Sequence, residues 1–234
     1  MLYDYVVILI IAHDALFPAG ALRTLLVRRS VAHRTLRLHL GDPFPNDVRR
    51  FKAIVSLGGE MGAGEEQQFP FLRDEVTFVR SAVVAGVPVL GIDLGARILA
   101  RSLGGSVRRA PVGERGWSSV QLTPAGKRDS LFAGIGTPLR AFHWHQEAFT
   151  LPPGAELLAT TDACRNQAFR FAMSWGVQFH PEVDAAMIEA WSIGTEDFVE
   201  LRRVEAALLP AWRRRAAILF RNFLRMAECV GRST

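Results

Sequence analysis

A glycine-flanked turn between an apolar segment and an amphipathic one places the strongest constraint on the fold of this chain. Residues 87–92 form a short apolar run typical of a buried strand, and residues 94–103 carry apolar side chains at helical spacing. Between them lies Gly91-Ile92-Asp93-Leu94-Gly95, the G-x-nucleophile-x-G pattern of a sharp strand-to-helix turn. Such a turn presents its central side chain at the end of a sheet, beside the positive end of a helix. The pattern therefore predicts an α/β fold with Asp93 in the position of a nucleophile.

Alternating segments extend this prediction along the chain. Strands are expected at 5–11, 35–40, 53–57 and 87–92, and helices at 21–30, 72–85 and 94–103. This alternation is typical of a doubly wound, mostly parallel central sheet flanked by helices. Later strands are expected at 118–123, 140–145, 156–161 and 168–178, then helices at 184–191, at 195–209 and from about Pro210. We expect one domain over residues 1–191 and a C-terminal helical extension over 192–234 packed on it.

Composition argues against several classes of protein. The net charge of +5 is carried mainly by scattered arginines, and the densest group, Arg213 to Arg215, lacks interleaved aromatic residues, so nucleic-acid binding is not expected. No run reaches the roughly 18–20 uncharged apolar residues of a membrane span, and residues 6–12 lack the basic segment of a signal peptide. We expect a cytoplasmic protein. Cys164 and Cys229 have no metal-ligand spacing, so neither a metal nor a cofactor is predicted.

Two further motifs offer catalytic groups. Gly58-Gly59-Glu60-Met61 follows a predicted buried strand, and such a turn can direct backbone N–H groups at a developing oxyanion, although a plain strand–helix connection would have the same pattern. His180 and Glu182 lie two residues apart at a strand end. On an extended chain they share a face, so Glu182 can orient the imidazole as an acid or base.

A third motif is rich in aromatic and imidazole groups. Residues 142–147 (FHWHQE) contain His143 and His145 at a predicted strand end, where they suit the wall of a pocket. Taken alone, the same pattern also fits packing at the core and edge of a sheet.

The ordered set of motifs resembles the class I glutamine amidotransferase family, in particular the free-standing proteins similar to the glutaminase part of GMP synthetase. The resemblance covers about residues 5–191 and is strongest over 53–182. It rests on Gly58-Gly59, the Gly91–Gly95 turn and His180-Pro-Glu182, supported by residues 131–134, 142–145 and 166–169. The resemblance implies the doubly wound fold of that family.

The resemblance also implies roles for individual residues. The family's nucleophile is a cysteine that attacks the side-chain amide of glutamine, and Asp93 holds its position here. His180 and Glu182 would be the base and its orienting carboxylate, and the N–H groups of Gly59 and Leu94 the oxyanion hole. The substrate-binding positions would be Gly58, Glu60, Arg97, His143 and His145. Arg97 stands where the family usually has a glutamine that contacts substrate, and Glu60 where proline is frequent.

An aspartate changes the chemistry of this position. A thiolate forms a thioester that water hydrolyses, whereas a carboxylate attacking an amide would form an acid anhydride, which is uphill. A carboxyl is ionised at neutral pH, so Asp93 should favour the imidazolium form of His180. Arg97 lies one helical turn after Asp93. It either pairs with Asp93 in an inert turn, or holds a substrate carboxylate while Asp93 and Glu60 share acid–base work.

Three functional hypotheses follow. The first, which we favour, is a diverged enzyme that uses Asp93, His180 and Glu182 for hydrolysis or proton transfer on a small glutamine-like or anionic molecule. The second is a pseudoenzyme retained for binding or regulation. The third is an ordinary glutaminase carrying an engineered Cys-to-Asp change, which comparison with the encoding gene would reveal. A homodimer, or a separate synthetase or acceptor protein, is the expected partner.

Overall fold

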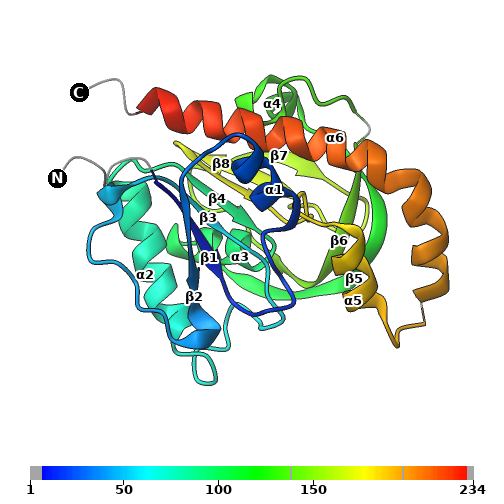
Figure 1. Cartoon of the computed structure of the whole chain (residues 1–234), viewed down its shortest axis with the longest axis horizontal. Coiled ribbons are helices and arrows are strands. Elements are labelled where there is room, and N and C mark those ends of the chain that lie inside the picture. Colours follow the sequence, from blue (N-terminus) through cyan, green and yellow to red (C-terminus); the bar gives the residue numbers. More distant parts are fainter. Residues whose placement is uncertain (1–6, 138, 197, 231–234) are drawn as a thin grey trace.

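A single mixed sheet crosses the protein. Over the residues that the computed structural model describes (7–137, 139–196 and 198–230), its nine strands follow the order β2-β1-β3-β4-β9-β8-β7-β5-β6 (Figure 1). The parallel half contains β2 (His33–Arg37), β1 (Val7–Ala12), β3 (Phe51–Ser56), β4 (Val89–Ile92) and β9 (Ser174–Val177). The antiparallel half contains β8 (Ala168–Phe171), β7 (Glu156–Thr160), β5 (Val107–Leu122) and β6 (Leu139–Phe149).

Helices cover both faces of this sheet. One face carries α1 (Gly20–Arg28), α5 (Ala185–Ser192) and α6 (Phe198–Val230), and the other carries α2 (Phe71–Val84) and α3 (Leu94–Ser102) (Figure 1). Short helical turns are α4 (Pro124–Arg128), η1 (Leu38–Leu40), η2 (Val48–Arg50) and η3 (Ser130–Phe132). Successive residues of a strand point to opposite faces, so Ile8 and Ile10 join one apolar core while Leu9 and Ile11 join the other. The doubly wound α/β fold is therefore confirmed.

Two expectations about individual elements are wrong. Residues 168–178 form a hairpin of β8 and β9 rather than one strand, with a turn at Ala172, whose φ is 50°. The two helices expected around Pro210 are one continuous helix, α6. Proline removes one helical hydrogen bond, but Leu209 and Trp212 on either side of it are both buried in the core, which holds the helix together across the proline. The helix bends along its length (Figure 1).

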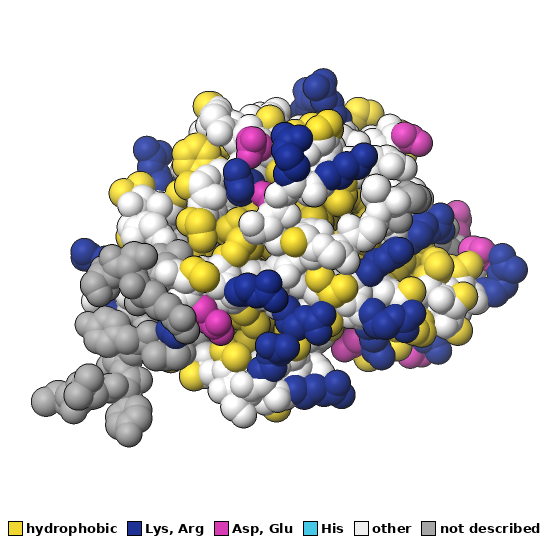
Figure 2. Space-filling view, turned by 90° about the horizontal axis from the view of Figure 1, so that it is seen from above, with side chains coloured by type: hydrophobic (Ala, Val, Ile, Leu, Met, Phe, Trp, Pro, Cys, Tyr) yellow, Lys and Arg dark blue, Asp and Glu magenta, His cyan; other side chains and the backbone are white. Residues whose placement is uncertain are grey.

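The C-terminal segment is part of the main core. Trp212, Leu219, Phe220 and Phe223 of α6 pack in the same apolar cluster as β1 and β3. On the face that carries α6, Lys and Arg side chains outnumber Asp and Glu (Figure 2). Across the described residues, no helix combines the length and the apolar character needed to cross a bilayer.

Candidate active site

The turn from Gly91 to Gly95, which we call the elbow, holds Asp93 in a strained conformation. Asp93 joins β4 to α3 with φ of 51° and ψ of −107°, a region that residues other than glycine rarely adopt. The flanking glycines permit this turn. A Cβ on Gly91 would collide with the carbonyl oxygen of Gly95, and one on Gly95 would collide with that of Ser56. Backbone strain of this kind is characteristic of functional sites.

Substituting Gly95 by alanine is expected to destabilise the protein because the new methyl group collides with the backbone of β3. Overpacking of a buried site costs about 1–3 kcal/mol, and urea unfolding would measure the loss. Gly64→Ala is the matched control, since Gly64 is exposed and a Cβ there meets no atom within 4 Å. Equal unfolding midpoints for the two variants would contradict this account of the elbow.

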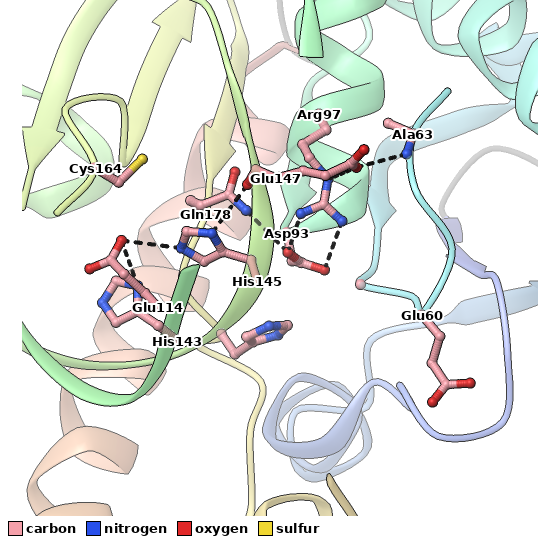
Figure 3. Close-up of polar contacts among 12 residues, drawn as sticks. Glu60, Ala63, Asp93, Arg97, Glu114, His143, His145, Glu147, Cys164 and Gln178 are labelled. Carbon is pink, nitrogen blue, oxygen red and sulfur yellow. Dashed lines mark hydrogen bonds and ion pairs between the residues drawn. The ribbon is translucent and has the colours of Figure 1, made fainter. Parts of the chain in front are cut away.

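The charge of Asp93 is neutralised by protein groups. Arg97 donates from Nη1 to Oδ1 at 2.7 Å and from Nη2 to Oδ2 at 3.4 Å, and Gln178 Nε2 donates to Oδ1 at 3.1 Å (Figure 3). The side chains of Asp93 and Arg97 are only 1% and 4% exposed. Arg97 Nε also lies 3.4 Å from Glu147 Oε2, and Glu147 accepts a hydrogen bond from the N–H of Ala63. Of the two arrangements left open for Arg97, the structure has the ion pair with Asp93.

His180 and Glu182 form a buried dyad beside the elbow. His180 Nδ1 lies 2.8 Å from Glu182 Oε1, and the other ring nitrogen, Nε2, has no partner among the described residues. A Cβ on Gly58 would lie 3.1 Å from His180 Cε1 and 3.3 Å from Asp93 Oδ2, so this glycine allows the two side chains to approach. A residue of α6 contacts the dyad: Trp212 Nε1 donates a hydrogen bond to the backbone carbonyl of His180.

The electrostatic environment favours a protonated His180. Burial alone would lower its pKa, but the charge and hydrogen bond of Glu182, together with the charge of Asp93, outweigh burial and raise the pKa above its usual value. The direction agrees with the prediction from the sequence. The cause differs in part, since the sequence pointed to Asp93, whereas Glu182 makes the larger contribution.

The two residues expected to form an oxyanion hole, Gly59 and Leu94, lie close to Asp93. Leu94 is the first residue of α3, where N–H groups lack intrahelical acceptors. Gly59 packs against Leu94, since a Cβ on Gly59 would lie 2.8 Å from Leu94 Cδ2. Gly59 and Leu94 therefore lie side by side at the elbow, and their role as an oxyanion hole stays a prediction.

A cavity of about 440 Å³ opens next to the elbow. Of the residues expected to bind substrate or stabilise an oxyanion, Gly59, Glu60, Arg97 and His145 line it, together with Asp93. Among the described residues, the lining does not include Gly58, Leu94, His180 or Glu182. The carbonyl of Gly58 accepts a hydrogen bond from His13 Nδ1.

His143 and His145 belong to a second polar cluster rather than to the elbow. Both side chains are buried and face Glu114 of β5, and the ligand atoms of the three residues lie within 4.8 Å of one another (Figure 3). Burial lowers the pKa of His143 to about 3. His143 is not among the described residues that line the cavity, and its contact with substrate stays a prediction.

Sequence reasoning missed three residues of this region. Gln178 and Glu147 lie inside motifs that the sequence singled out, but nothing local indicates that they contact Asp93 and Arg97. Glu114 lies in no motif and far from His143 in the chain. Only the pairing of β5 with β6 brings it opposite His145.

Comparisons with known proteins point to one family. The family model described as glutamine amidotransferase class-I matches residues 39–188. The chain is 30% identical to the glutamine amidotransferase-like protein YfeJ of Salmonella typhimurium, over 76% of this chain and 77% of that protein. It is 32% identical to one of the subunits of the glutamine-hydrolysing GMP synthase of Sulfolobus acidocaldarius, over 61% and 73%. A glutamine amidotransferase crystal structure from Thermotoga maritima superposes with a TM-score of 0.82 and 31% identity, covering 97% of this chain and all of that one.

Proposed function

The chain belongs to the class I glutamine amidotransferase family, and we propose that it is a diverged enzyme that acts on a small metabolite without using Asp93 as a nucleophile towards glutamine. The observation that carries this proposal is the contrast between two neighbouring groups. Asp93 is fully paired with Arg97, while His180 keeps Nε2 free of protein partners among the described residues and has its other nitrogen oriented by Glu182.

The pairing of Asp93 argues against acyl transfer through its carboxylate. Arg97 and Gln178 stabilise the anion and lower its nucleophilicity. An attack on an amide would also yield an anhydride rather than a thioester. An aspartate held in this way is better suited to stabilising a cation, either the imidazolium of His180 or a charge that develops on the substrate.

The dyad supplies a proton donor. A protonated His180 carries its transferable proton on Nε2, the nitrogen without a partner among the described residues, and Glu182 fixes the ring orientation through Nδ1. The backbone N–H groups of Gly59 and Leu94 provide stabilisation for negative charge on an oxygen. This combination suits hydrolysis or proton transfer at a carbon next to a carbonyl group.

The cavity suits a ligand that carries charges of both signs. Apart from Arg97 and the carboxylates that pair with it, its charged lining consists, among the described residues, of Arg109 and Arg115 from β5 and of Glu60 and Glu65 from the loop after β3. Arg115 lies over the ring of Trp144 at 5.3 Å, which holds its guanidinium at the cavity wall. A small amino-acid-like molecule, with a carboxylate and an ammonium group, matches this lining.

The test is a turnover screen of the natural chain against amino acids and γ-substituted glutamates in D₂O, followed by proton NMR for product formation and for exchange of C–H protons. For the substrate found, His180→Asn is expected to lower the rate by about 10²–10⁴-fold, the usual contribution of a general acid or base. The rate should fall as the pH rises through the raised pKa of His180, because the acid form is lost. His39→Asn, at an exposed imidazole, is the control. An unchanged rate for His180→Asn would refute the proposal.

The ion pair at the elbow also favours a second candidate, a pseudoenzyme that binds a ligand without converting it. Binding of an amino acid, measured by calorimetry, that survives combined substitution of Asp93, His180 and Glu182 would support this reading. The relative from Sulfolobus acidocaldarius is part of a synthase. A separate synthetase or acceptor protein in the cytoplasm is therefore the partner that we propose, with a homodimer as the alternative.

A further inference from the structure

Glu114, His143 and His145, which we call the Glu114 cluster, converge by strand pairing. Glu114 on β5 lies directly opposite His145 on β6, and His143 lies two residues earlier on the same face of β6. A register irregularity between Arg109 and Glu114 sets this pairing. The three side chains are nearly or completely buried, with side-chain exposures of 4%, 0% and 0%.

The hydrogen bonds of the two imidazoles are incomplete. His145 Nδ1 lies 3.1 Å from the carbonyl oxygen of Glu147, and because a carbonyl only accepts, Nδ1 carries the proton. In the neutral ring, Nε2 then presents a lone pair, and it lies 3.3 Å from Glu114 Oε2 without a hydrogen bond. His143 has no hydrogen-bond partner for either nitrogen among the described residues. The lone pairs of His145 Nε2 and of the Glu114 carboxylate therefore face each other in a buried space.

The other buried imidazoles that face carboxylates differ from this cluster. His13 Nε2 lies 2.7 Å from Glu75 Oε2, and His180 Nδ1 lies 2.8 Å from Glu182 Oε1, both in hydrogen-bonding geometry. In each of those pairs, one proton between the nitrogen and the oxygen is enough to satisfy both atoms. The wider and unbonded contacts of the Glu114 cluster leave room for a larger cation between the donor atoms.

Hydrogen bonds from two side chains fix the carboxylate of Glu114. Thr161 Oγ1 donates to Oε1 at 2.9 Å, and Gln167 Nε2 donates to Oε2. Gln167 Nε2 also lies 3.1 Å from Thr161 Oγ1. Hydrogen bonds that orient a carboxylate, and a backbone carbonyl that fixes the tautomer of a histidine, are the usual supports of metal ligands.

We propose that the Glu114 cluster binds a divalent transition-metal ion, with zinc as the best match, through Glu114 Oε2, His145 Nε2 and one ring nitrogen of His143. Two imidazoles and one carboxylate are a common ligand set for zinc, with a water molecule completing a tetrahedron. Ligand atoms of a tetrahedral zinc ion lie about 3.4 Å apart, since each lies about 2.0–2.2 Å from the metal. The distance of 3.3 Å between His145 Nε2 and Glu114 Oε2 meets this requirement. The wider separation of 4.0 Å from His143 Nδ1 to the same oxygen contracts on binding.

The test uses the whole 234-residue chain, treated with EDTA, returned to metal-free buffer and titrated with zinc chloride by calorimetry. We expect about one zinc ion per chain with a dissociation constant of about 1 μM or lower. A cobalt(II) titration of the same protein should give the intense visible bands of a tetrahedral site. This readout needs no variant, so it holds even where a substitution impairs folding.

Variants of the Glu114 cluster test whether zinc binds at these residues. Glu114→Gln and His145→Asn are expected to weaken zinc binding by more than about 100-fold, and Gln167→Met by about 10–100-fold. His39→Asn, at an exposed histidine, should bind as the natural chain does. Absence of zinc binding by the natural chain, or equal binding by the natural chain and both ligand variants, would overturn the proposal and leave a shared proton between Glu114 and His145.

Discussion

The double variant Asp93→Cys/Arg97→Gln is expected to release ammonia from glutamine at least about 10³-fold faster than the natural chain, because loss of a nucleophile typically costs a hydrolase about 10⁴–10⁶-fold in turnover. The other groups that the family resemblance assigns to the reaction lie near the elbow. The His180–Glu182 dyad has its hydrogen bond, and Gly59 and Leu94 lie beside the elbow. A thiol next to an imidazole supplies the missing nucleophile.

Arg97 is changed together with Asp93 for an electrostatic reason. In Asp93→Cys alone, the buried guanidinium loses its main carboxylate partner and competes with His180 for the thiolate. Asp93→Asn/Arg97→Gln is the matched control, since it has the same cavity charges without a thiol. A coupled assay with glutamate dehydrogenase measures the ammonia. If the cysteine variant is no faster than this control, then the cavity does not fit glutamine, and the aspartate is not the only barrier to glutaminase activity.

Replacing Arg97 by methionine is expected to destabilise the protein by about 3–5 kcal/mol, because the carboxylate of Asp93 then remains buried with Gln178 as its main partner. Glu147 loses a neighbouring cation in the same variant. Denaturant unfolding at neutral pH measures the change.

Two variants make this prediction specific. Asp93→Asn/Arg97→Met removes both charges, so it should recover most of the lost stability. Arg101→Met serves as the control for loss of an arginine from the same helix. Its side chain is 27% exposed and pairs with Glu66 at 2.6 Å, so its loss should cost no more than about 1 kcal/mol. Similar destabilisation by Arg97→Met and Arg101→Met would show that burial of the ion pair is not the cause.

Much of the fold was predictable because it depends on short-range patterns. The alternation of strands and helices up to residue 103 follows from side-chain periodicity, and the flanking glycines of the elbow place Asp93 at the end of β4. The hairpin at Ala172 and the unbroken α6 escaped prediction. In each case tertiary packing decided against the local signal: pairing of β8 with β9, and burial of Leu209 and Trp212 around Pro210.

Some contacts of the candidate site were also predictable from the sequence, and others were not. The i, i+2 spacing of His180 and Glu182 is local, although the two side chains meet in the turn that follows β9 rather than on an extended strand. Arg97 was a candidate partner of Asp93 from its position one turn along α3, but the sequence could not choose between that role and a contact with substrate. The burial of Asp93 decides between these two roles, because a buried carboxylate in a site of low dielectric requires a nearby cation.

By itself, the sequence determined the family, the α/β fold and the position of Asp93 at the turn between β4 and α3. These features depend on residues that are adjacent in the chain or repeat at the period of a helix or strand. Only the tertiary structure decided that Gln178 completes the shell of Asp93, and that Glu114 faces His145. The reason is that such contacts depend on strand register, on the irregularity in β5 and on the exclusion of water, none of which a local pattern specifies.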